Sequence, residues 1–441
     1  MTRSARRTLE LRPDAAAASP MPTWQLLAII CGTASLHLFL CFVNTSVTAV
    51  SDMHVAALEG LAIVVVFAIS YRQMQHIHLF LLGGLTVYVL ALGAIRVSFA
   101  MNGGIDIKPI RDLTIPVTFL LLGLQARNLR TADTVVRVLT ALVVAVALFE
   151  YFFLDIFTQY FNIARYYISR GAMEAAQSMQ TGDLFISGMR PQGTGGRNLL
   201  PFLGEHRVSS VFLEPVSLGN FGMILVVWAL TRSKFKHKLY WGLILSGLTL
   251  IVLSDSRFGA YFCVIATALL FLPPAYVTVG LLFVPPLAVT GLLMLPDILA
   301  ASGHGIDNTF IGRIMLSGGV LNQFNTATWL GFNISALPTF DSGYAYMISG
   351  IGVLGFAIAW YILLAMRGSE QFETFRNYAA AYYGVILCIS NSPFTIKTAS
   401  ILWFMMGVLA SATARTVPTS VSRTTHSRRA VHQVMPARRI M

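Results

Sequence analysis

The segment Arg207-Val-Ser-Ser-Val-Phe-Leu-Glu-Pro-Val-Ser-Leu-Gly-Asn-Phe221 links a long polar stretch of the chain to an apolar run. It places an arginine, two serines and Glu214 where the apolar run begins. Charged groups at such a junction are costly to desolvate, so their presence indicates a function. Pro215 is tolerated only near the first turn of a helix, which predicts a helix start close to it. We interpret the segment as one wall of a site at a membrane surface.

The composition is typical of a membrane protein. Of the 441 residues, 56% are hydrophobic and 11% are charged, and the mean hydropathy is +0.69. A soluble domain carries roughly 25% charged residues, so this chain has too little charge to cover a surface that faces water. The cysteines lie within apolar runs, which argues against a disulfide framework or a metal site. We expect an all-α polytopic membrane protein that uses no cofactor.

The apolar runs give the expected number of spans. A helix that crosses a bilayer needs about 20 mostly apolar residues, and the chain offers about 12 such runs. They lie at 23–43, 54–71, 77–98, 110–126, 133–155, 211–231, 238–254, 257–274, 276–295, 342–366, 377–394 and 398–415. The first run is too long for a cleaved signal peptide, so we expect it to be retained as the first span.

Basic residues in short loops predict the orientation, because such loops face the cytoplasm. The short basic loops each follow an even-numbered run, so they all fall on the same side of the membrane. They lie at 72, 127–130, 232–238 and 367–376. The basic N-terminus 1–22 and the basic tail 416–441 are then both cytoplasmic and flank a single domain, 23–415. The net charge of +12 therefore indicates orientation and lipid contact rather than nucleic-acid binding.

Two long loops, 156–210 and 296–341, fall on the outer face in this frame. Loops of such length in a compact protein are usually functional or disordered. Three further charged segments are expected on the same face. Ser254-Asp255-Ser256-Arg257 joins two spans in a tight turn, Gly312-Arg313 lies in the second loop, and Asp341-Ser-Gly-Tyr344 leads out of it.

These segments together predict an anion site. Arginine forks bind phosphate oxygens bidentately and stay charged at any working pH. A lipid diphosphate suits such a set, and a nearby carboxylate of suitable pKa can deprotonate a hydroxyl. Each residue also has a structural alternative. Arg207 can be an arginine at the membrane interface whose side chain extends to water. Residues 254–257 can form a solvated turn, and Asp341 can be a helix N-cap.

Other motifs have simpler interpretations. Gly350-Ile-Gly352-Val-Leu-Gly355 matches a dinucleotide-binding pattern, which requires a preceding strand. It lies instead within an apolar run, so we interpret it as a closely packed helix surface. Charged residues inside spans either pair with one another or line a cavity; they are Glu59, Arg96, Arg137 and Glu150.

The charged segments resemble one superfamily. Arg207 to Pro215, with Gly219, resembles the segment after the large periplasmic loop of Wzy-type bacterial polysaccharide polymerases and the related O-antigen ligases. Ser256-Arg257 resembles the Ser-Arg turn of these proteins, and Gly312-Arg313 resembles their Gly-Arg element. Asp341 stands near the place where ligases carry a histidine. Xanthan-type exopolysaccharide polymerases are the most similar subfamily.

The resemblance implies a GT-C-like, metal-independent glycosyltransferase in a bacterial inner membrane, with a periplasmic active site. The donor would be a glycan on undecaprenyl diphosphate, the acceptor a lipid-linked repeat unit, and direct displacement would invert the anomeric centre. A chain-length regulator or export protein is the expected partner. Arg207 and Arg257 would neutralise the diphosphate, and Asp341 or Glu214 would act as the base. The expected substrate-binding residues are Arg313, Ser210, Ser256, Tyr344 and His304.

Three alternatives remain: a ligase, a transporter of the lipid-linked repeat, and a scaffold protein. A ligase shares the fold and the arginines, so only its acceptor distinguishes it. A transporter is expected to have paired half-repeats with interrupted helices in matching positions, and the sequence shows no such repeat.

Overall fold

The computed structural model describes residues 21–71, 76–99, 107–126, 128–177, 182–190, 200–236, 240–303, 310–335, 339 and 342–416. Within these ranges the regular structure is helical, and no β-strand forms beyond an isolated bridge between Met189 and His206. The all-α prediction is confirmed. Most of the basic N-terminus and of the basic tail lies outside the described residues.

Six of the described helices are long and apolar enough to cross a membrane. They are α2 (Thr23–Ser46), α3 (Asp52–Ser70), α6 (Leu129–Phe152), α10 (Pro215–Lys236), the pair α13 (Pro274–Leu282) and α14 (Val284–Ala301), and α17 (Gly343–Ala365). This is the structure of a membrane-spanning protein.

Helices also lie in the other predicted runs. They are α4 (His76–Ser98), α5 (Ile107–Leu124), α11 (Trp241–Leu253), α12 (Arg257–Leu270), α18 (Glu370–Ile386) and α19 (Ile396–Thr416). Of these, α18 starts before the predicted run at 377–394 and ends at Ile386. The predicted helix start beside Pro215 is confirmed, because α10 begins there. The predicted run at 211–231 began too early, since residues Ser210–Phe212 form the 3-10 helix η4 instead.

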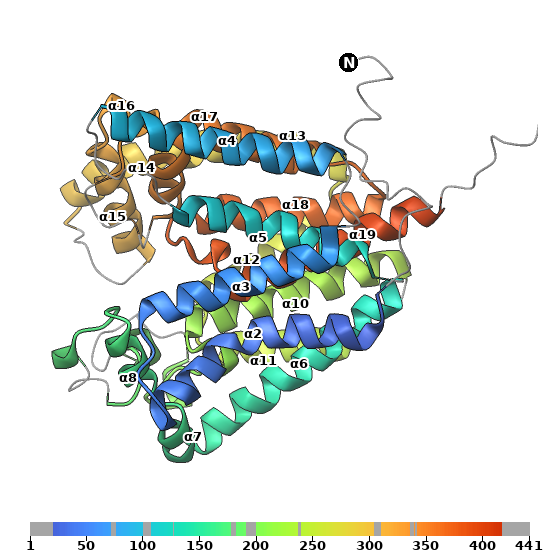
Figure 1. Ribbon diagram of the computed structural model, residues 1–441, viewed down its shortest axis with the longest axis vertical. Helices are drawn as coiled ribbons and strands as arrows, with labels where there is room; N and C mark the ends of the chain where they lie inside the picture. The colour runs from blue at the N-terminus through green and yellow to red at the C-terminus, as the bar shows by residue number, and fades with distance from the viewer. Residues whose placement is uncertain are drawn as a thin grey trace, which may run out of the picture.

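The helices are arranged as an elongated bundle with two distinct ends (Figure 1). The beginning of α2 and the end of α19 lie at one end. Short helices from both long loops lie at the other: α7 (Leu154–Tyr160) and α8 (Ile163–Ser169), then α15 (Phe310–Asn322) and α16 (Thr326–Trp329). The two loops therefore contribute to the same end of the molecule, which is also where α10 and α19 begin.

Close backbone contact between α5 and α19 fixes the centre of the bundle. A Cβ atom added at Gly123 would lie 2.2 Å from the carbonyl oxygen of Phe404, and one at Gly407 would lie 2.1 Å from that of Leu120. Only glycine permits such an approach. The contact brings the polar beginnings of α5 and α19 to the same level.

Helix α17 is interrupted at Gly352, whose φ of 71° and ψ of 162° are not helical. The predicted span at 342–366 is present as α17, but its helix is broken at this residue, which the sequence did not predict. Gly352 packs against Leu330 and Gly331 so closely that a Cβ atom would lie 2.5 Å from the Leu330 carbonyl oxygen. The predicted close packing of the glycine motif is nevertheless present, since Gly355 packs tightly on Tyr88.

Arg96 satisfies the carbonyl groups that this interruption exposes. The guanidinium is fully buried and donates to the carbonyl oxygens of Gly331 at 2.7 Å, Ser349 at 3.1 Å and Gly350 at 2.8 Å. The last two carbonyls end the first half of α17, where a cation is electrostatically favoured. Arg96 thus binds backbone oxygens of both the interrupted helix and the segment that packs against it.

Candidate active site

Glu150 near the end of α6 holds the segment 207–221 in place. Its carboxylate accepts the backbone N–H groups of Ser209 and Ser210, at 3.0 and 2.5 Å, and also the Ser209 hydroxyl. These bonds stabilise a turn in which Ser210 and Leu213 have positive φ angles of 52° and 59°. Such angles are strained for non-glycine residues, so Glu150 anchors the backbone of the candidate site.

Arg207 ties the first long loop to the turn between α11 and α12. Its Nε donates to the carbonyl oxygen of Ser254 at 2.9 Å, and its terminal nitrogens donate to those of Ser187 at 3.1 Å and Asp255 at 3.4 Å. A guanidinium carries five N–H donors. These contacts leave one N–H on each terminal nitrogen for a ligand and fix the direction of the fork.

The predicted arginines share one electrostatic environment. Burial lowers the pKa of Arg207 to about 10; the carboxylate of Asp255 opposes the shift, whereas the charges of Arg313, Arg190 and Arg257 add to it. Arg257 is the first residue of α12 and Arg313 lies on α15. Three separate elements therefore bring positive charge to one place.

Arg190 was not among the predicted site residues. It is 4% exposed, its Nε lies 3.5 Å from a carboxylate oxygen of Asp255, and it donates to the carbonyl oxygen of Gly204 at 2.7 Å. The bridge between Met189 and His206 places it beside Arg207. No local motif marks this pairing, so sequence reasoning had no signal for it.

We define the arginine cluster as Arg190, Arg207, Arg257 and Arg313. The charges that act on Arg207 are those of the other three arginines and of Asp255, and Arg190 pairs with Asp255. Several neighbouring guanidinium groups are suited to bind a multiply charged oxyanion such as phosphate or diphosphate.

The other predicted residues have mainly structural contacts. The Ser210 hydroxyl is buried and donates to the Val143 carbonyl oxygen at 2.8 Å. The Ser256 hydroxyl accepts the N–H of Gly259 at 3.2 Å and caps α12. The Tyr344 hydroxyl donates to the Gly384 carbonyl oxygen at 2.8 Å. His304 and Asp341 lie outside the described residues.

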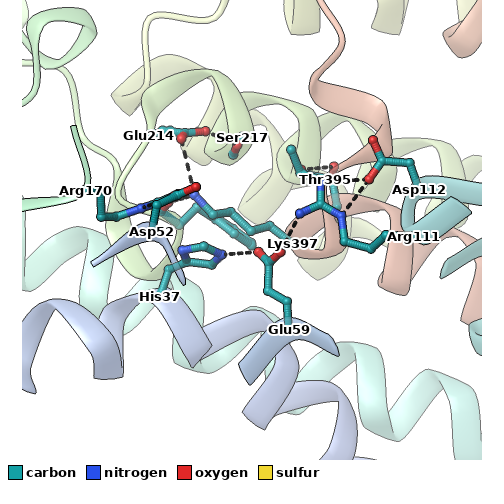
Figure 2. A network of polar contacts seen from close by, with 12 residues as sticks. His37, Asp52, Glu59, Arg111, Asp112, Arg170, Glu214, Ser217, Thr395 and Lys397 are labelled. Carbon is teal, nitrogen blue, oxygen red and sulfur yellow. Dashed lines mark hydrogen bonds and ion pairs between the residues drawn. The ribbon is translucent and has the colours of Figure 1, made fainter. Parts of the chain in front are cut away.

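A second polar group, the central network, includes Glu214 and Ser217 of segment 207–221 (Figure 2). Glu214 pairs with Lys397, whose Nζ lies 3.3 Å from Oε1 and donates to the Phe212 carbonyl oxygen at 2.9 Å. Glu214 also accepts the hydroxyls of Tyr167 at 2.7 Å and Ser217 at 2.9 Å.

The central network continues through α2, α3 and α5 (Figure 2). His37 contacts Glu59 at 2.9 Å, and the other carboxylate oxygen of Glu59 accepts Arg111 at 3.0 Å. Arg111 also pairs with Asp112 at 2.8 Å, and Asp112 accepts the Tyr346 hydroxyl at 2.6 Å. Glu59, predicted to pair within the membrane or line a cavity, therefore pairs with residues of two other helices.

The environment of Glu214 weakens it as a base. Burial alone would raise its pKa, but the ammonium of Lys397, with hydrogen bonds from Tyr167 and Ser217, lowers the pKa to about 2. A carboxylate with so low a pKa takes up a proton poorly near neutral pH. Its contacts indicate that Glu214 holds the start of α10 against α19.

Among the described residues, no group of three or more His, Cys, Asp or Glu side chains is placed to bind a metal ion. Comparisons of the chain with family models, curated proteins and solved structures returned no match.

Proposed function

We propose that the chain is a Wzy-type glycosyltransferase that polymerises lipid-linked oligosaccharide repeat units at the periplasmic face of a bacterial inner membrane. The arginine cluster is the observation that carries this proposal, because the charges of four arginines act together and the guanidinium of Arg207 is fixed in direction. The proposal includes twelve spans, a GT-C-like architecture and cytoplasmic termini. The resemblance of segments 207–215, 256–257 and 312–313 to this superfamily supports it.

The proposed reaction is a direct displacement. A hydroxyl of the acceptor repeat unit attacks the anomeric carbon of the donor glycan, the bond to undecaprenyl diphosphate breaks, and the diphosphate leaves with the bond's electron pair. The configuration at that carbon inverts. Arg207 and Arg257 neutralise the charge that develops on the leaving group, and Arg313 holds the second lipid or the glycan. Preorganised donors of this kind are often the largest single contribution to catalysis.

The acceptor hydroxyl must lose a proton in this reaction. We propose Asp341 as the base, since it is the last residue of the second long loop. Glu214 is the weaker candidate because its pKa is lowered to about 2. Turnover by Asp341→Asn at the wild-type rate across the pH range would exclude Asp341 from this role.

The cluster can be tested in membrane vesicles supplied with a lipid-linked repeat unit. Arg207→Ala and Arg257→Ala are each expected to slow polymer formation by about 100-fold or more, which corresponds to losing one donor to a developing charge. Arg165→Ala is the matched control, since Arg165 also belongs to the first loop but is exposed. Near wild-type rates for both cluster variants would refute the proposed role.

A transporter of the lipid-linked repeat is the second candidate. The interruption of α17 at Gly352 favours it, because carriers commonly place substrate at broken helices. The two functions differ in what accumulates when the protein is removed. Unpolymerised single repeats on the outer leaflet indicate a polymerase, and repeats on the inner leaflet indicate a transporter. A ligase is distinguished by transfer of finished polymer to a different lipid.

A further inference from the structure

Arg137 is a charged residue placed inside a helix that is long enough to cross a membrane. It lies eight residues after the first residue of α6, which is about 12 Å along the helix axis. Its side chain is exposed, and in the part of the chain that the structure describes it forms no hydrogen bond or ion pair. An arginine at such a depth requires an anionic partner or a path to water.

The acid nearest in sequence is already engaged. Asp133, one turn before Arg137, is buried and accepts two hydrogen bonds from Arg232, at 3.1 and 2.9 Å. Lys236 lies 3.9 Å from the same carboxylate. Because two cations already surround Asp133, this end of α6 keeps a surplus of positive charge.

Arg137 lines a cavity between α6 and α11, which lie side by side (Figure 1). The cavity has a volume of about 550 Å³, within the range of roughly 300–1,000 Å³ that holds small ligands. Tyr240, Trp241 and Ser246 are polar residues of its wall, and Ala141 and Val144 are apolar ones. The lining thus suits a ligand with a charged head and an apolar body.

The aromatic residues place this cavity at the level of lipid headgroups. Trp241 is 60% exposed, and tryptophan and tyrosine concentrate where the membrane meets water. The Tyr240 ring is contacted by Arg232 and by Lys236, each 5.9 Å from the ring centroid. Arg232 and Lys236 therefore lie beside the cavity wall, and their charges make its electrostatic potential more positive.

We propose that this cavity binds the phosphate of an anionic phospholipid, with Arg137 as the phosphate ligand and Ser246 as a second polar residue beside the headgroup. The cavity lies at the beginning of α11 and beside the middle of α6, away from the short helices of the two long loops (Figure 1). The lipid therefore belongs to the leaflet opposite those loops. The inference depends on the membrane placement of α6 and not on the proposed transferase activity.

Lipid retention by the purified full-length protein tests this proposal. The detergent-solubilised protein is mixed with cardiolipin, phosphatidylglycerol or phosphatidylcholine, and bound lipid is counted by native mass spectrometry. Wild-type protein is expected to retain the two anionic lipids in preference to phosphatidylcholine. Arg137→Ala is expected to weaken that retention about fivefold, the contribution of one arginine near an anionic surface. Arg137→Lys is expected to keep part of it, since lysine retains the charge without the fork.

Arg130→Ala is the matched control, because Arg130 is also exposed on α6, two turns nearer its start, and does not line the cavity. Equal lipid retention by the two alanine variants would overturn the proposal and identify Arg137 as an arginine that merely extends to water. Inorganic phosphate and glycerol phosphate form the second arm of the experiment. If either displaces the lipid at low concentration, the site binds a soluble anion and the lipid assignment is wrong.

Discussion

The ammonium of Lys397 lies 3.3 Å from the carboxylate of Glu214, and this pair joins the first turn of α19 to the residue before α10. Both partners come from the ends of helices that run through the centre of the bundle. Lys397 is 3% exposed, so its charge depends on this contact and on the carbonyl oxygen of Phe212.

We expect Lys397→Met to destabilise the protein by about 3–5 kcal/mol, because it leaves the Glu214 carboxylate without its counter-ion. Glu214→Gln combined with Lys397→Met is expected to recover part of the loss. Lys234→Met is the control: Lys234 lies 3.9 Å from a more exposed Glu370, and such pairs contribute about 0–1 kcal/mol. Thermal unfolding in detergent measures all three, and equal effects of the two single lysine variants would contradict the assignment.

The same pair gives the protein a predictable response to acid. The pKa of Glu214 is lowered from 4.5 to about 2, so the unfolded chain binds the proton before the folded protein does. The stabilisation is complete above pH 4.5 and is lost as the pH falls toward 2. The difference in unfolding temperature between wild type and Glu214→Gln should therefore be constant near neutral pH and shrink below pH 4.5. A difference that grows on acidification would reverse the sign of this prediction.

His206 should respond over a different pH range. Burial and the neighbouring charge of Arg190 lower its pKa from 6.5, so the folded protein keeps this histidine neutral. Below pH 6.5 the unfolded chain takes up the proton first, and stability falls with the pH. Replacing His206 with glutamine should flatten the profile just below pH 6.5. Identical slopes for the variant and wild type would show that other groups control stability in this range.

Gly352 should tolerate no side chain. Gly352→Ala forces alanine to a φ of 71° and brings its Cβ atom to within 2.5 Å of the Leu330 carbonyl oxygen. With a ψ of 162° this backbone conformation is essentially restricted to glycine, and it costs another residue about 1–3 kcal/mol. Gly319→Ala on α15 is the control, since a Cβ atom there meets no atom within 4 Å and alanine favours helix. We expect a clear fall in unfolding temperature for the first variant and none for the second.

Local chemistry accounts for the parts of the fold that sequence reasoning predicted. The apolar runs predicted helices because a helix forms all the hydrogen bonds of its own backbone, which lipid cannot supply. Pro215 predicted the start of α10 because proline suits the first helical turn. Ser256 had the same kind of signal, since serine is a favoured N-cap, yet it was assigned to substrate. That residue shows how a capping role can resemble a binding role in sequence.

The rest of the candidate site depends on contacts between distant residues. Lys397 stands one residue before the predicted span and contacts Phe212, 185 positions earlier. Arg190 reaches the arginine cluster only because the first loop folds back on itself. Nothing near Gly352 in sequence distinguishes a helix break from a closely packed helix surface. Spacing within one segment cannot reveal such pairings.

Arg96 has a consequence for how the protein is made. Its acceptors lie 235, 253 and 254 positions later in the chain. During synthesis α4 therefore emerges from the ribosome well before the carbonyl groups that accept these hydrogen bonds. The contacts between Arg96 and α17 form only after α17 has been translated.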